Sequence, residues 1–143
     1  MADDPNDEKA LHGIKVLDLT RFLSGPQTTL FLAALGAEVV KIDDPKLGDP
    51  VANSPPFFGK NGVSMSQNSA TDVGIAYLKR ARSKKSIELD LKNARDLDLF
   101  KKLVKKADIV VGGSAQPPDL SQQIHEILPD IGHLSRTRVR YLL

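Results

Sequence analysis

The order of apolar and turn residues in the first third of the chain constrains the fold more than any other feature. Residues 14–19 (IKVLDL) are rich in apolar and β-branched side chains, which predicts a strand. Residues 26–35 (PQTTLFLAAL) predict a helix, because Pro26 suits its first turn and Gly36 suits the position after its end. Residues 38–42 (EVVKI) predict a second strand. Connections this short favour a parallel strand–helix–strand unit with a right-handed crossover.

A second unit of the same kind follows later in the chain. Residues 86–91 alternate apolar and polar side chains, which predicts a strand. Residues 93–106 predict a helix capped by Asn93, with Asp96 three residues later in a capping-box arrangement. The apolar stripe of this helix consists of Leu97, Phe100, Leu103 and Val104. Residues 109–111 predict a further strand. Two such units favour the α/β class, with a mostly parallel Rossmann-like sheet.

The rest of the chain is harder to assign from its pattern. Residues 1–10 read as a disordered lead-in, and residues 44–76, with four prolines and four glycines, as a long loop with a short helix near its end. Residues 11–111 then form the folded segment, and residues 112–143 a divergent tail. In that tail Ser121 can begin a short helix, and the last apolar and basic residues can form a strand.

Composition limits the functions that the chain can have. It has 143 residues, of which 41% are hydrophobic and 27% charged, typical of one globular domain. Its formal net charge of +2 is too small to indicate nucleic-acid binding by itself. Cysteine is absent, which excludes disulfides, thiolate metal sites and a cysteine nucleophile within the sequence.

Other common sites and targeting signals are also missing from the pattern. The three histidines have no metal-binding spacing, so no metal ligand is predicted, and no G-x-S-x-G serine-hydrolase elbow is present. Among the scattered carboxylates, Asp18 and Asp90 are expected to be structural. The acidic start, MADDPNDEK, resembles neither a secretory signal nor a transit peptide. The chain is therefore expected to be cytoplasmic, with an organelle address left open.

Two segments have the character of a phosphate-binding site. The turn at Gly25 and Pro26 precedes a helix, where free N–H groups and the helix dipole favour anions. An ordinary α/β turn has the same pattern, and the G-x-G-x-x-G dinucleotide motif is absent. The second segment, residues 79–85 (KRARSKK), has five cations, which suits a multiply phosphorylated ligand. A solvated turn or an RNA-facing patch remains an alternative for it.

Three stretches in register resemble one known family. Residues 11–43 (LHGIKVLDLTRFLSGPQTTLFLAALGAEVVKID) look like the opening of the family III CoA-transferases, the CaiB/BaiF group. Residues 82–92 (RSKKSIELDLK) resemble the family's lysine-rich approach to its next strand. Residues 103–111 (LVKKADIVV) resemble the helix and strand that follow. The order and spacing of these matches agree over residues 11–111.

The resemblance implies an activity and a set of contacts. Family members move CoA between acyl-CoA thioesters and carboxylic acids, through an aspartate that attacks the thioester. CoA or acyl-CoA is thus expected as a substrate, with no permanently bound cofactor and no membrane partner, and homodimers are typical of the family. The positions that match its CoA-contacting segments are Leu23, Ser24, Gly25, Pro26, Arg82, Ser83, Lys84 and Lys85. Of these, Arg82, Lys84 and Lys85 are expected to contact phosphate.

The sequence also departs from the family pattern. At residues 112–118 it reads GGSAQPP where members usually have EN(F/Y)-x-P-G. The family's nucleophilic aspartate lies farther along than residue 143, so no catalytic residue is assigned. A fragment, a splice variant or a frameshift product would each lack the nucleophilic aspartate. Each would also expose apolar surface that the missing part normally covers. The alternative function is a non-catalytic module that binds CoA or another nucleotide.

Overall fold

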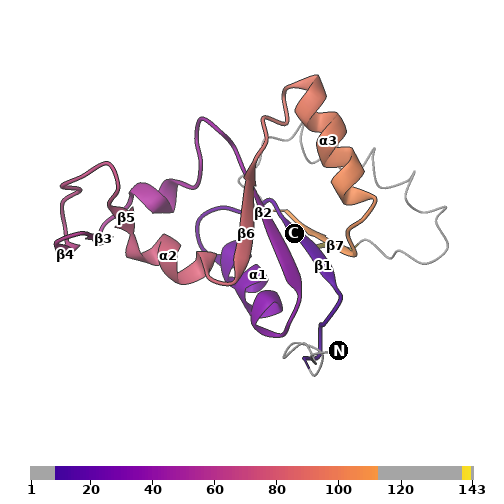
Figure 1. The fold of residues 1–143 in the computed structure, drawn as a ribbon, viewed down its shortest axis with the longest axis horizontal. Helices are drawn as coiled ribbons and strands as arrows, with labels where there is room; N and C mark the ends of the chain where they lie inside the picture. The colour runs from indigo at the N-terminus through magenta and orange to yellow at the C-terminus, as the bar shows by residue number, and fades with distance from the viewer. Residues whose placement is uncertain (1–8, 113–139, 143) are drawn as a thin grey trace, which may run out of the picture.

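The main body of the protein is a parallel sheet with helices on both faces. The computed structural model describes residues 9–112 and the backbone of residues 140–142. The main sheet has the strand order β6–β2–β1–β7–β8, with every pair parallel. Figure 1 labels β1, β2, β6 and β7 of this sheet. Its strands are β1 (Lys15–Asp18), β2 (Glu38–Asp43), β6 (Lys84–Glu88), β7 (Ile109–Val111) and β8 (Arg140–Leu142). The predicted α/β class with a mostly parallel sheet is therefore confirmed.

Within residues 9–112, three α-helices accompany this sheet: α1 (Ser24–Ala34), α2 (Ile75–Ala81) and α3 (Ala94–Val104). The first predicted unit is present as β1–α1–β2, with the helix starting two residues before Pro26. The second is present as β6–α3–β7, but its two strands are not neighbours, because β2 and β1 lie between them. The predicted strand at 86–91 begins and ends earlier than expected, at Lys84 and Glu88.

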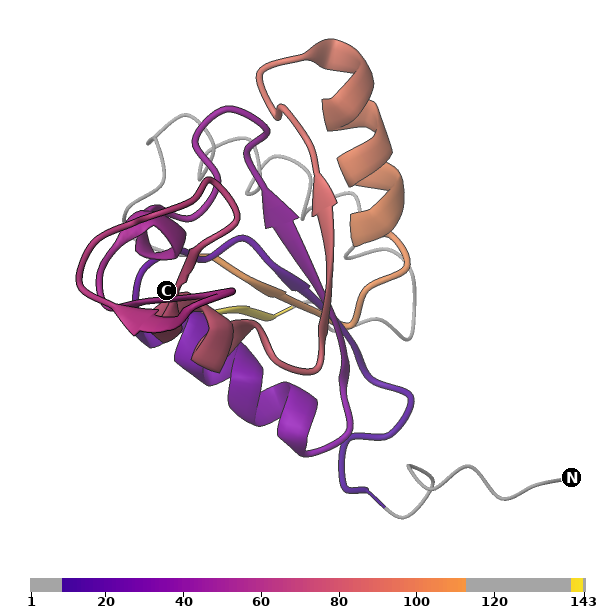
Figure 2. The same cartoon turned by 60° about the vertical axis from the view of Figure 1, so that its left-hand side comes forward.

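Alternate residues of the strands build two cores, one on each face of the sheet. Leu17 and Val110 belong to the cluster that includes Phe100 and Val104 of α3. Their neighbours Val16 and Val111 belong to the cluster that includes Ala33 of α1. Because side chains alternate along a strand, this pattern places α1 and α3 on opposite faces. Figure 2 shows the resulting three layers.

The apolar stripe of α3 packs as predicted, but its expected capping box does not form. Phe100 is completely buried and Val104 is 1% exposed. The Asn93 side chain accepts a hydrogen bond from the Arg95 amide at 2.9 Å, which confirms the N-cap. The Asp96 carboxylate instead accepts from the backbone N–H of Asp90 at 3.0 Å, so it ties the preceding turn to the helix.

The prediction of a long loop over residues 44–76 is wrong. This segment contains a 3₁₀-helix, η1 (Pro50–Asn53), and a small antiparallel sheet of order β4–β3–β5. Its strands are β3 (Phe57–Gly59), β4 (Gly62–Ser64) and β5 (Val73–Gly74). The segment extends to one side of the main sheet and then enters α2, the expected short helix (Figure 1). Strands of two or three residues are too short to produce a readable period of two.

The outcome for the two ends of the chain is mixed. Residues 140–142 pair in parallel with β7, which confirms a strand near the end of the chain. The expected lead-in lies mostly outside the described residues, as does the expected helix after Ser121. The division between residues 11–111 and 112–143 stays a prediction. None of the helices in the described part of the chain is long and apolar enough to cross a membrane.

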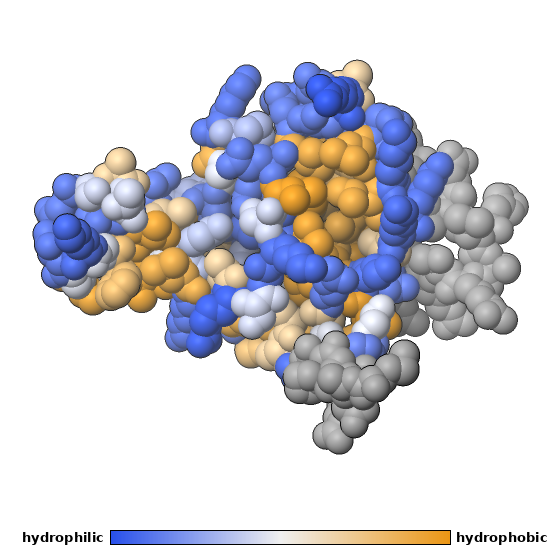
Figure 3. All heavy atoms as spheres, viewed as in Figure 1, coloured by the Kyte–Doolittle hydropathy of each residue, from blue (hydrophilic) through white to orange (hydrophobic). Residues whose placement is uncertain are grey.

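Several large apolar side chains are exposed in the described part of the chain. Leu23, Phe31 and Leu35 lie at the start, middle and end of α1, and each is at least half exposed. On the other face, Ile87, Leu91 and Leu97 are only partly buried against the α3 core. Figure 3 shows hydrophobic residues gathered over the region between β6 and α3. The expectation of exposed apolar surface therefore agrees with the structure.

Replacing Phe100 by alanine should destabilise the α3 core strongly. A fully buried phenylalanine leaves a cavity when truncated, so we expect the free energy of unfolding to fall by about 3–5 kcal/mol. Urea denaturation followed by circular dichroism measures it. Leu99→Ala is the control, because Leu99 is 46% exposed on the same helix and should cost about 1 kcal/mol or less. Equal losses for both variants would contradict this account of the core.

Candidate functional site

The α1 face of the sheet changes from apolar to charged toward the carboxyl ends of the strands. Val16 of β1 pairs with Val39 of β2, and both are buried. Two residues later on the same face, Asp18 pairs with Lys41, and both are again buried. Buried charges are tolerated only when they are paired and hydrogen-bonded. The carboxyl end of this face therefore contains a polar network where a core would otherwise continue.

Lys84 is the centre of the first part of this network. Its Nζ donates to Asp18 Oδ2 at 3.0 Å, to the Pro26 carbonyl at 2.9 Å and to Thr29 Oγ1 at 2.7 Å. The Lys84 side chain is only 1% exposed. Burial lowers the pKa of the Lys84 ammonium, and the Asp18 carboxylate opposes that shift. Since an ammonium has three N–H groups, these three acceptors use its whole donor capacity.

Asp18 is the anion of this network and is fully buried. It accepts hydrogen bonds from the Thr20 amide at 2.9 Å and from the hydroxyl groups of Thr20 and Thr29. The Thr29 hydroxyl thus donates to Asp18 while it accepts from Lys84. These contacts confirm the structural role expected for Asp18. They connect the end of β1, the first turns of α1 and the start of β6.

Lys41 forms a second buried cluster, which the sequence analysis missed. Its Nζ donates to the Thr20 carbonyl at 2.7 Å and lies 3.2 Å from Asp43 and 3.4 Å from Asp49. The other Asp43 oxygen accepts from the Ser86 hydroxyl of β6 at 2.8 Å. A lysine inside the apolar run EVVKI was the available signal, because a charge in a buried strand needs a partner.

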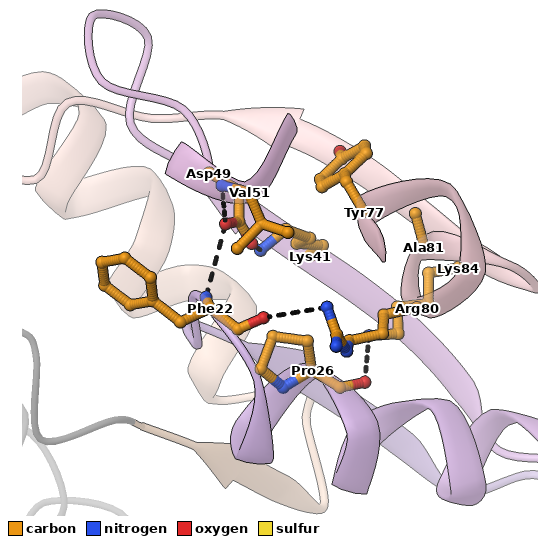
Figure 4. Close-up of a pocket in the computed structure, with 9 residues that line it drawn as sticks. All are labelled: Phe22, Pro26, Lys41, Asp49, Val51, Tyr77, Arg80, Ala81 and Lys84. Atoms are coloured by element: carbon orange, nitrogen blue, oxygen red, sulfur yellow. Dashed lines mark hydrogen bonds and ion pairs between the residues drawn. The ribbon is translucent and has the colours of Figure 1, made fainter. Parts of the chain in front are cut away.

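Phe22 connects this cluster to α2. It is a non-glycine residue with a backbone φ of 71°, a conformation that side chains disfavour. The Phe22 amide donates to Asp49 Oδ1 at 3.3 Å, and its carbonyl accepts from Arg80 of α2 at 3.4 Å. Figure 4 shows the carbonyl groups of Phe22 and Pro26 directed at Arg80 and Lys84. The turn before α1 is therefore held through its backbone.

A small cavity of about 10 Å³ lies among these side chains, between α1 and α2 (Figure 4). Its lining includes Pro26, Tyr77, Arg80 and Lys84. The Arg80 Nε is buried there without a hydrogen-bond partner in the structure. The cavity can hold about one water molecule, so a ligand larger than water has to bind outside it.

Of the first group of predicted site residues, Leu23, Ser24, Gly25 and Pro26, only Pro26 lines this cavity. Leu23 is 60% exposed and Ser24 is exposed, whereas Pro26 is buried against the network. Leu23 occupies the N-cap position of α1 and supplies no side-chain hydrogen bond. The first turn of the helix therefore has no side-chain cap, which leaves its N–H groups suited to an anion.

Gly25 has a packing role in this turn. A Cβ atom built on Gly25 would lie 2.3 Å from Thr20 Cβ and 2.4 Å from Thr20 Cγ2. Thr20 cannot easily move, because it is 1% exposed and its amide and hydroxyl both donate to Asp18. The single glycine of the turn is thus required by the close approach of Thr20.

The second group of predicted residues is divided in space. The Lys84 ammonium donates to the Pro26 carbonyl in the first turn of α1. Ser83 and Lys85 instead line an open groove of about 580 Å³ at the other end of that helix, beside Gly36 and Glu38. Lys85 pairs with Glu38 at 2.7 Å, and both side chains are exposed. Arg82 is also exposed, with its Nε donating to the Lys79 carbonyl. The structure thus unites the two groups only at Pro26 and Lys84, and the CoA contacts stay a prediction.

No group of three or more His, Asp or Glu residues within the described part of the chain is arranged to hold a metal ion.

Burial and the Asp43 carboxylate raise the pKa of the Tyr77 phenol, so the phenol stays protonated near neutral pH.

Comparison with known sequences gives a consistent result. The model of CoA-transferase family III matches residues 11–118. Succinyl-CoA:glutarate CoA-transferase of Homo sapiens is 36% identical over 141 residues, covering 94% of this chain and 29% of that protein. Succinyl-CoA:mesaconate CoA-transferase of Haloarcula hispanica is 40% identical over 102 residues, covering 71% of this chain and 24% of that protein. The chain thus spans less than a third of either relative, and the alignment with the human protein extends past residue 111.

Solved structures give the same result for the fold. A CaiB/BaiF family protein from Brucella suis superposes with a TM-score of 0.68 and 28% identity, covering 86% of this chain and 31% of that one. A hypothetical protein from Mycobacterium tuberculosis superposes with a TM-score of 0.68 and 26% identity, covering 93% of this chain and 32% of that one.

Replacing Gly25 by alanine should destabilise the turn by overpacking it against Thr20. We expect the free energy of unfolding to fall by about 1–3 kcal/mol, the usual cost of an added methyl group in a tightly packed site. Urea denaturation measures the change. Ala34→Ser, at an exposed position near the end of the same helix, should stay within about 0.5 kcal/mol. A Gly25→Ala variant as stable as the parent would show that Thr20 yields easily.

Proposed function

Because this chain belongs to CoA-transferase family III, we propose that it supplies the CoA-binding part of an enzyme that moves CoA between acyl-CoA thioesters and carboxylic acids. The family match over residues 11–118 is the observation that carries the proposal. It takes in the α1 turn, the basic segment and the polar network between them.

The geometry of the α1 turn supports an anionic ligand at that end of the sheet. CoA carries a diphosphate and a ribose 3′-phosphate. Ser24 is exposed at the uncapped start of α1, where the helix dipole favours negative charge. Leu23 offers an apolar surface beside it. The exposed guanidinium of Arg82 retains free N–H groups that can pair with a phosphate group.

The chemistry of the reaction needs a carboxylate nucleophile that we assign to no residue of this chain. In the proposed reaction the carboxylate oxygen attacks the thioester carbonyl carbon, the C–S bond breaks, and CoA leaves as the thiolate. The product is a mixed anhydride between that carboxylate and the donor acyl group. Asp18 does not fit the role, because it is buried and bound to Lys84, Thr20 and Thr29.

The names of the relatives suggest a class of substrate. The human and Haloarcula proteins are named for succinyl-CoA together with glutarate or mesaconate. These acceptors are both dicarboxylic acids. We therefore propose succinyl-CoA as the donor and a short dicarboxylic acid as the acceptor for the complete enzyme.

Calorimetry with CoA and 3′-dephospho-CoA tests the binding role. If Arg82 contacts the 3′-phosphate, the 143-residue chain should bind CoA more tightly than 3′-dephospho-CoA. The expected difference in binding free energy is about 1.5–3 kcal/mol, the scale of a hydrogen bond to a charged group. Arg82→Ala should remove that difference. Lys101→Ala, an exposed lysine on α3, should keep it. Absence of CoA binding by the parent chain would refute the proposed function, and equal affinities for both ligands would refute the role of Arg82.

A thioester assay tests the absence of a nucleophile. The chain incubated with succinyl-CoA and glutarate should form no glutaryl-CoA above the buffer background. Liquid chromatography of the CoA esters measures the product. Turnover that depends on protein concentration would mean that a carboxylate within this chain performs the attack.

A further inference from the structure

We infer that Lys84 is a positioning residue, which acts on the ligand through the α1 turn rather than by touching a phosphate group. This inference rests on the proposed function, because the turn is where CoA would bind. It reassigns a residue that the family pattern places among the phosphate contacts.

The hydrogen-bond donors of Lys84 are already used within the protein. Its three N–H groups meet a carboxylate, a carbonyl and a hydroxyl, all within 3.0 Å. A phosphate oxygen would have to displace one of these acceptors. The displaced group would be left without its donor beside a side chain that is only 1% exposed, at a cost comparable to the new contact.

The position of Lys84 in the sheet is the second argument. Lys84 pairs with Val39 of β2, and Val39 pairs with Val16 of β1, so the lysine begins two strands away from its partner Asp18. To reach Asp18 its side chain crosses the face of the sheet under α1. A long, flexible stem with a compact charge suits this path.

The groups that Lys84 joins are the third argument. Pro26 lies in the first turn of α1, Thr29 lies one turn farther along, and Asp18 ends β1. Asp18 also holds the Thr20 amide, so both ends of the intervening segment are fixed by the same network. Without the ammonium the Asp18 charge would be buried and unpaired, and the start of α1 would be free to move.

Two roles of Lys84 make opposite predictions for substitutions. A phosphate contact needs only the charge, so Lys84→Arg should bind CoA almost as the parent does, and Lys84→Met should lose affinity for phosphorylated ligands. A positioning role needs three acceptors to converge on one nitrogen, which a planar guanidinium cannot provide. Both variants should then lose about the same factor, at least tenfold, for CoA and for 3′-dephospho-CoA alike.

The experiment measures amide hydrogen exchange as well as ligand binding. In Lys84→Met without ligand, the amides of Thr20 and Gln27, whose acceptors are Asp18 and the Leu23 carbonyl, should exchange at least about tenfold faster. This acceleration should exceed that of the Leu97 amide in α3, which reports general destabilisation. Lys101→Met is the control and should change neither site. If Lys84→Met fails to fold, Thr29→Val is the substitute variant. It keeps the Lys84–Asp18 pair but removes one acceptor of Lys84, so the Thr20 and Gln27 amides should show a smaller acceleration of exchange.

The outcomes separate this inference from the proposed function. Unchanged exchange at Thr20 and Gln27 would overturn the positioning role, whatever the chain binds. Rescue of CoA affinity by Lys84→Arg, or a loss confined to CoA while 3′-dephospho-CoA binds normally, would also overturn it. If the parent chain binds no CoA, the proposed function fails, and the exchange measurements alone decide whether Lys84 fixes the turn.

Discussion

The buried pair between Lys84 and Asp18 is the interaction on which the candidate site depends. A buried ion pair of this kind contributes little net stability over an apolar replacement, because desolvation offsets the attraction. Removal of one partner is nevertheless strongly destabilising, because it leaves an uncompensated buried charge. Here the pair links three elements that are distant in sequence, β1, α1 and β6. The conformation of the turn before α1 therefore depends on the relative positions of β1, α1 and β6.

The second lysine extends this arrangement toward the inserted segment. Lys41 binds the Thr20 carbonyl and pairs with Asp49, which in turn holds the Phe22 amide. Arg80 of α2 holds the Phe22 carbonyl from the other side. The disfavoured backbone conformation of Phe22 is held by these two hydrogen bonds, both from the segment between β2 and β6. That segment is thus part of the site, although its short strands contribute little to the main core.

The sequence was sufficient for the elements with long apolar patterns and insufficient for the network. The strand around Val16 and the stripe of Phe100 and Val104 were predictable, because hydrophobic periodicity reflects burial directly. Lys84 was predicted to be in the site, but its surroundings were not, since a lysine in a basic run looks the same whether its ammonium meets solvent or Asp18. Arg80 belongs to the same basic run, so its contact with the Phe22 carbonyl was hidden for the same reason. Lys41 was missed although its charge inside an apolar run indicated a buried partner. Contacts between residues far apart in sequence, such as the approach of Thr20 to Gly25, leave no local pattern.

The place of β6 at the margin of the sheet has one more consequence. Among the described strands it forms the edge beside β2, and an edge strand presents backbone groups that can recruit another chain. Lys84 directs a charge inward from this edge, and Lys85 and Glu88 are exposed along it. Charges in these positions disfavour the addition of a foreign strand. The same lysine that fixes the turn therefore also helps to protect this margin against cross-β aggregation.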